Sequence, residues 1–95
     1  VVLRYNLPGE EVKVIRMAQA MGLEDTSNEA FIAAVEAMLD AIAIPTSLAD
    51  IGVPAECSQR IAEKAIQDSA AGTNPRHATV AEIRELTETA IARAR

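Results

Sequence analysis

Apolar and polar residues alternate along the first half of the chain with the period of amphipathic helices. Between residues 10 and 21 the polar side chains return about every third position, which predicts a helix with one narrow wet stripe. Gly22 follows directly, where a helix commonly ends in a left-handed glycine. The remaining positions predict a wide buried face made of Val12, Val14, Ile15, Met17, Ala18 and Met21.

A second helical pattern covers residues 29–43. Residues 26–28, Thr-Ser-Asn, supply candidate N-cap side chains. Ile44-Pro45 ends the pattern, because the residue before a proline is disfavoured in the α conformation. Glu29, Glu36 and Asp40 lie opposite the apolar stripe and predict a solvated face. The stripe itself consists of Phe31, Val35, Met38, Leu39 and Ile42.

Two further helical segments follow Pro45. Ser47 and Asp50 have the spacing of a capping box, which predicts a single turn of helix over residues 47–51. Pro54 suits a first helical position, so the pattern predicts a continuous helix over residues 54–71. The narrower apolar stripe of this helix consists of Ile61, Ala62, Ala65, Ile66 and Ala70.

A polar loop over residues 72–78 leads into the last helix. Thr79 and Glu82 form a second capping box at its start. Residues 1–8 are interpreted as the tail of a further element that begins upstream. Together the patterns predict an all-α fold, with about five helices in a small orthogonal or bundle-like domain around one aliphatic core. The apolar face of the last helix consists of Ile83, Leu86, Ala90, Ile91 and Ala94.

Composition narrows the classes of function. A chain of 95 residues is one domain at most, and its 49% hydrophobic content argues against disorder. Tyr5 and Phe31 are the only aromatic residues, too few for a base-stacking surface. The net charge of -5 argues against nucleic acid and anionic membranes as partners, and no apolar run reaches the roughly 20 residues of a membrane span. A single cysteine, Cys57, fits a reducing cytoplasm.

Few side chains in the sequence are suited to catalysis. His77 lies beside Arg76 without partners spaced to bind a metal or to orient a base, which favours a solvated or interface histidine. Cys57 precedes an apolar stripe by one turn, which favours a half-buried structural thiol. Tyr5 has no partner that spacing identifies. The glycines stand singly at turns, so the sequence contains no phosphate-binding loop.

Three segments resemble the iron-containing alcohol dehydrogenase family, in the same order and at suitable distances. Residues 44–48, Ile-Pro-Thr-Ser-Leu, lead into residues 50–54, Asp-Ile-Gly-Val-Pro, and are similar to the family's helix, proline and short turn. Residues 73–76, Thr-Asn-Pro-Arg, and the capped helix after them are similar to its closing loop and last helix. Residues 4–6, Arg-Tyr-Asn, resemble the end of the segment that follows the family's last metal-ligand histidine.

The resemblance implies that residues 1–95 are the C-terminal helical portion of a larger, dehydroquinate-synthase-like alcohol dehydrogenase. Such enzymes use NAD(P) to interconvert alcohols with aldehydes or ketones. An N-terminal α/β domain binds the nucleotide, and one Asp and three His bind a divalent iron. All of these residues would precede Val1, so the resemblance implies no catalytic, cofactor-binding or metal-binding residue here and an inactive isolated piece. The chain's own N-terminal domain is the expected partner, and uncovered apolar surface would also favour a homo-oligomer.

One position and one loop are the site residues that the resemblance suggests. The family often carries a cysteine near the substrate pocket, four residues before the loop's asparagine, and Ala70 occupies that position. Ala70 is therefore expected to line the pocket, with a helix-packing alanine as the plain alternative. In the loop, Pro75 fixes the backbone and Asn74 satisfies local backbone groups. Arg76 is expected to tie the loop to another helix or to the N-terminal domain.

Two other functions remain open from the residues alone. A free-standing helical interaction module would present an apolar groove to a partner helix. A regulatory domain would bind a small acid or metabolite at the Arg76 loop. The module predicts a monodisperse fold with one exposed apolar patch, whereas the dehydrogenase piece predicts uncovered surface that normally faces the absent domain.

Overall fold

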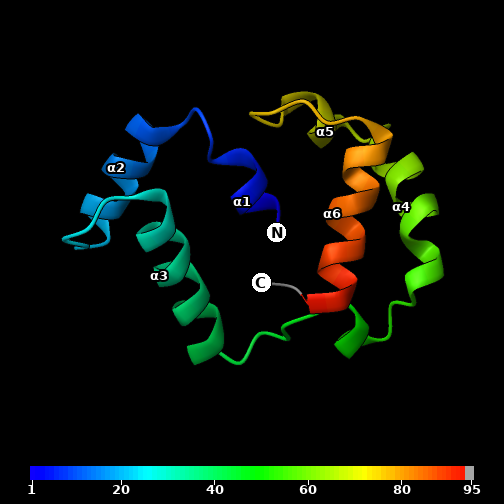
Figure 1. Cartoon of the computed structure of the whole chain (residues 1–95), viewed down its shortest axis with the longest axis horizontal. Coiled ribbons are helices and arrows are strands. Elements are labelled where there is room, and N and C mark those ends of the chain that lie inside the picture. The colour runs from blue at the N-terminus through cyan, green and yellow to red at the C-terminus, as the bar shows by residue number, and fades with distance from the viewer. Residues whose placement is uncertain (94–95) are drawn as a thin grey trace. The chain divides into compact units, whose positions relative to one another are not determined.

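The computed structural model describes residues 1–93, and the side chains of residues 1–92; Ala94, expected on the last apolar face, lies outside the described residues. Within that part of the chain every regular element is helical, so the predicted all-α class is confirmed (Figure 1). The residues form two compact units, an N-terminal unit over residues 2–44 and a C-terminal unit from residue 45 onward. The elements are α1 (Val2–Asn6), α2 (Glu11–Ala20), α3 (Asn28–Ala41), η1 (Ala49–Ile51), η2 (Ala55–Cys57), α4 (Ser58–Ala65), α5 (Ser69–Thr73) and α6 (Val80–Arg93).

The helix count and the single core differ from the sequence-based expectation. Six α-helices are found among residues 1–93, because residues 2–6 form a helix and the helix expected over 54–71 is divided. The turn expected over residues 47–51 is a 3-10 helix. The prediction of a single aliphatic core is also wrong, since each unit buries its own residues. The C-terminal unit buries Ser47, Ser58, Ala62, Thr87 and Ile91.

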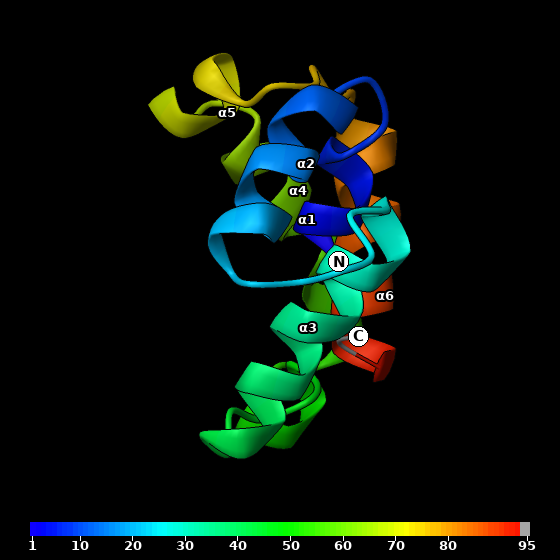
Figure 2. The ribbon, with the colours of Figure 1, turned by 90° about the vertical axis from the view of Figure 1, so that its left-hand side faces the viewer.

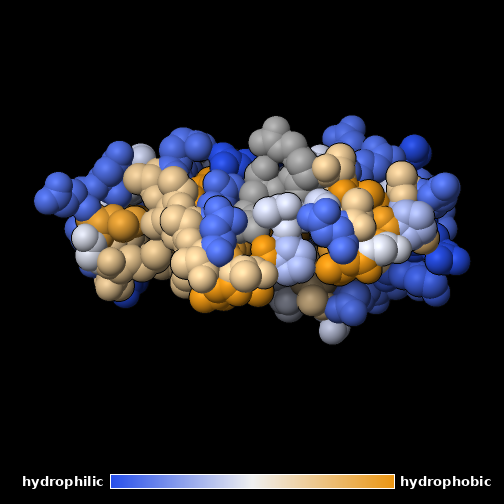
Figure 3. Space-filling view, turned by 90° about the horizontal axis from the view of Figure 1, so that it is seen from below, coloured by the Kyte–Doolittle hydropathy of each residue, from blue (hydrophilic) through white to orange (hydrophobic). Residues whose placement is uncertain are grey.

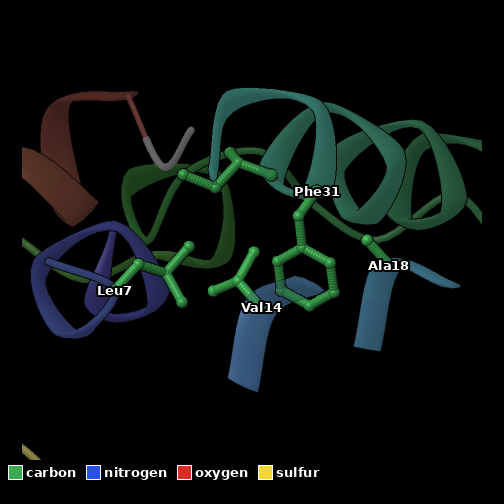
Figure 4. Packing of buried hydrophobic residues seen from close by; sticks show 5 residues of the cluster. Leu7, Val14, Ala18 and Phe31 are labelled. Carbon is green, nitrogen blue, oxygen red and sulfur yellow. The ribbon is translucent and has the colours of Figure 1, made fainter. Parts of the chain in front are cut away.

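The N-terminal unit has a small aliphatic core with one aromatic ring. Figure 4 shows the Phe31 ring reaching from α3 toward Val14 of α2, with Leu7 on the far side of Val14. Val14 and Ala18 are fully buried, so α2 presents one close-packed edge to α3. Leu3, Leu23 and Val35 pack against the rim of this cluster, whose buried members are Leu7, Val14, Ala18, Phe31 and Ile32.

The prediction that α2 has a wide buried face is wrong. Val12 is 75% exposed and Ile15 40% exposed, because within this unit α2 packs on one edge only. The apolar stripe of α3 also extends beyond α2, the helix that packs on it. α3 has 14 residues and α2 has 10, so α3 is roughly 6 Å longer. Figures 1 and 2 show the C-terminal half of α3 passing the end of α2. Met38 on that half is 52% exposed, and Ile42, directly after the helix, is 61% exposed.

Both α2 and α3 end in the same hydrogen-bonded turn. After α2, the backbone N–H of Gly22 donates to the Gln19 carbonyl and that of Leu23 donates to the Ala18 carbonyl, each over 3.0 Å. After α3, Ala43 and Ile44 repeat the pattern toward Asp40 and Leu39, again over 3.0 Å. This is the Schellman arrangement, whose first residue past the cap is left-handed. Gly22 has a φ of 78° and Ala43 a φ of 59°.

The C-terminal unit is built on the packing of α4 against α6, which run side by side in Figure 1. Ala62 of α4 is fully buried and Ile91 of α6 is 6% exposed. The predicted capping box of the short turn is confirmed: the N–H of Ser47 donates to Asp50 Oδ2 and the N–H of Asp50 to Ser47 Oγ, both over 3.1 Å. The N–H of Leu48 also donates to the Ala90 carbonyl over 2.8 Å, which fastens this turn to α6.

The prediction of one continuous helix over residues 54–71 is wrong. Pro54 is extended and precedes η2, and α4 ends at Ala65. Asp68 takes an extended conformation, with a ψ of 142°, and its Oδ1 accepts from the N–H of Ala70 over 2.8 Å. A short polar side chain that bonds to nearby backbone offers an alternative to continuing a helix. The apolar stripe therefore stops early, and Ile66 is 38% exposed.

Candidate functional site

The loop that carries the expected site residues begins in α5. Ala70 is exposed in this helix, and its carbonyl accepts from the Thr73 hydroxyl over 3.2 Å. The N–H of Asn74 donates to the Ala71 carbonyl over 3.4 Å, and its side-chain amide donates to the carbonyl of Arg76. Asn74 thus bridges both sides of Pro75. The loop is held in shape by its own backbone and by Asn74.

The end of the loop is fixed by the start of α6. Arg76 and His77 are exposed, and both take part in polar interactions with the rest of the chain. The predicted second capping box is confirmed: the N–H of Thr79 donates to Glu82 Oε2 over 2.8 Å, and the N–H of Glu82 donates to Thr79 Oγ1 over 3.2 Å. The Asn-Pro-Arg loop is therefore held between a capped α5 and a capped α6.

Cys57 is the last residue of η2, directly before α4, and is partly buried, as expected for a structural thiol. Arg60 Nη2 donates to the Cys57 sulfur over 3.6 Å. Tyr5 is half-buried in α1 and belongs to the N-terminal unit, whereas Cys57 and His77 belong to the C-terminal unit.

A groove lies along α4 and α6, and sequence reasoning missed it. Gln59 of α4 faces the first two turns of α6 across this groove, whose remaining lining residues are Val80, Ala81, Arg84, Glu85 and Glu88. Arg84 Nε donates to Glu88 Oε1 over 2.7 Å, and the buried Ser58 hydroxyl donates to the same oxygen over 3.3 Å. The Arg84 hydrogen bond holds the pKa of Glu88 below its usual range. The i, i+4 spacing of these two residues was the available sequence pattern.

The acidic row of α3 is open to solvent as predicted, and two of its members, Glu29 and Glu36, also form ion pairs with Arg4. Arg4 of α1 donates through Nη1 to Glu29 Oε2 over 3.1 Å and through Nη2 to Glu36 Oε1 over 3.4 Å. The Glu29 hydrogen bond is the largest cause that raises the pKa of Arg4. All three side chains are open to solvent, so each pair contributes little stability, but together they orient α1 on α3.

The described side chains offer neither a metal site nor a membrane span. Among the described residues, no group of three or more His, Cys, Asp or Glu side chains is arranged to hold a metal ion. The side chains present here therefore do not fit the family's iron, which takes several such ligands in one place. No helix in residues 1–93 is long and apolar enough to cross a bilayer.

Comparison with known proteins identifies the class to which this helical fold and its Asn-Pro-Arg loop belong. Residues 1–91 match the C-terminal domain of the Fe-containing alcohol dehydrogenase family, and the chain belongs to that family. The resemblance drawn from the sequence is thereby confirmed. Members of this family are oxidoreductases.

Two curated proteins are similar to this chain over most of its length. Lactaldehyde reductase of Escherichia coli K12 and that of Escherichia coli O157:H7 are each 38% identical over 96 residues, which covers 94% of this chain. The same alignment covers 25% of each relative, so the chain spans about a quarter of the length of the curated relatives it matches. No solved structure matches the chain.

Proposed function

We propose that this chain is the C-terminal helical part of a metal-dependent, NAD(P)-linked alcohol dehydrogenase that interconverts alcohols with aldehydes or ketones. The observation that carries the proposal is the family match over residues 1–91. The nucleotide and the divalent iron are then bound by polypeptide outside these 95 residues, and this piece alone has no turnover.

The substrate that we propose is a short aldehyde with a neighbouring hydroxyl group, such as lactaldehyde. Support comes from the name of the two relatives that are 38% identical over 94% of the chain. The Ala70 side chain lines the substrate pocket in this proposal. A larger side chain there, Ala70→Leu, is expected to raise KM for the aldehyde with a smaller effect on KM for the nucleotide, whereas a packing alanine would affect stability alone.

The partner that we propose for the N-terminal unit is the chain's own upstream domain. Eight large apolar side chains of this unit are 40% exposed or more, and Figure 3 shows apolar side chains gathered over the end of α3. Fully burying such a side chain contributes about 1.5–3 kcal/mol. Covering Val12 and Ile42, which are 75% and 61% exposed, would therefore contribute on the order of 1–2 kcal/mol each.

Arg76 is proposed to fasten the loop to another helix or to the nucleotide-binding domain. A guanidinium offers five donors in a planar fork, which suits several carbonyl or carboxylate acceptors at once. Arg76→Lys keeps the charge but loses the fork. It is expected to lower the thermal stability of the whole enzyme while changing that of this chain alone by less, as differential scanning calorimetry of both proteins would show.

A chimaera tests the proposed function directly. The matching quarter of Escherichia coli lactaldehyde reductase is replaced by this chain, and NADH oxidation is followed with lactaldehyde after iron is supplied. Activity well above that of a matched truncation, which lacks the C-terminal quarter, is the expected result. A second control carries a helical segment of equal length from an unrelated protein.

Two outcomes would contradict the proposal. One is a chimaera that is soluble, helical by circular dichroism and loaded with iron, yet no more active than the truncation. The other is aldehyde-dependent NADH oxidation by this chain alone after iron is added, which would locate the reaction within the 95 residues. A chimaera that fails to fold is replaced by a binding measurement, in which the purified chain is titrated with the truncated relative. Absence of binding there would also count against the proposed upstream partner.

A further inference from the structure

We draw no further inference here: the strongest candidate, the unpartnered apolar surface of the N-terminal unit around Val12, Ile15, Met38 and Ile42, carries nothing beyond the upstream domain already proposed, because nothing in the structure shows what covers it.

Discussion

Ala43 offers a sharp test of how the end of α3 is built. This residue is left-handed, with a φ of 59°, and is the only non-glycine residue with positive φ in the described chain. Its side chain is exposed, so replacing it removes no packing. Gly22 holds the matching position after α2, with a φ of 78° and nothing within 4 Å of where a Cβ would stand. The two sites therefore differ chiefly in whether the side chain suits the backbone.

The expected magnitude follows from two opposing effects. A left-handed conformation costs an L-residue roughly 1–2 kcal/mol, which Ala43→Gly removes. Glycine also raises the conformational entropy of the unfolded chain, which reduces the gain in stability by about 0.4–1 kcal/mol. The net expectation is a stabilisation of about 0.5–1 kcal/mol, or a rise in Tm of roughly 2–8 °C for a chain of this size. Gly22→Ala should lower stability by a similar amount, for the reverse reason.

Unfolding in urea, followed by circular dichroism at 222 nm, measures both changes. The matched control is Ala37→Gly, the same substitution at an exposed interior position of α3. It should destabilise by about 0.5–1 kcal/mol, since glycine is unfavourable within a helix. Opposite signs at positions 37 and 43 are the prediction. If Ala43→Gly destabilised as much as Ala37→Gly, the left-handed cap would not exist in solution and the reasoning would be refuted.

Three further predictions concern the core, the cap and acid stability. Phe31→Ala should lower the free energy of unfolding in urea by about 3–5 kcal/mol. Met38→Ala should be nearly neutral in this chain and destabilising in the full-length enzyme. Equal effects of Met38→Ala in both proteins would count against the proposal that the upstream domain covers Met38. Thr79→Ala should cost about 1 kcal/mol, and Thr79→Ser should restore most of it. Arg84 lowers the pKa of Glu88 in the fold, so the stabilising effect of Glu88 is present above the unfolded pKa and is lost as the pH falls through the lower pKa of the folded state. Glu88→Gln and Arg84→Gln should each flatten the acid limb of stability against pH, and a limb that stayed as steep would exclude this pair as a contributor.

Local structure was predictable from the sequence wherever three or four adjacent residues determine it. The capping boxes at Ser47–Asp50 and Thr79–Glu82 appear as predicted, because each is completed by bonds between residues three apart. The break at Asp68 was missed although its cause is also local. An apolar stripe that seemed to continue through residues 61–70 outweighed a good N-cap residue in its midst.

Burial was less predictable, because it depends on partners distant in sequence. Periodicity alone does not distinguish Val14, which is fully buried, from Val12, which is 75% exposed. The bond from Arg4 to Glu29 spans 25 residues, and no spacing rule anticipates it. For the candidate site, the sequence identified the loop of Asn74 to Arg76 through family resemblance. The groove beside Arg84 depends on how α4 meets α6, so it appeared only with the structure.

The hydrogen bond between Leu48 and Ala90 has a consequence for the order of events on the ribosome. Every buried residue of the N-terminal core lies between residues 7 and 32, so that core has all its parts once the chain has passed residue 44. The C-terminal unit cannot form its bond between Leu48 and Ala90 until residue 90 has been synthesised. At roughly 5–20 residues per second this interval lasts on the order of seconds. During that time the first unit is available to dock on the upstream domain proposed above, while the N–H of Leu48 has no carbonyl acceptor.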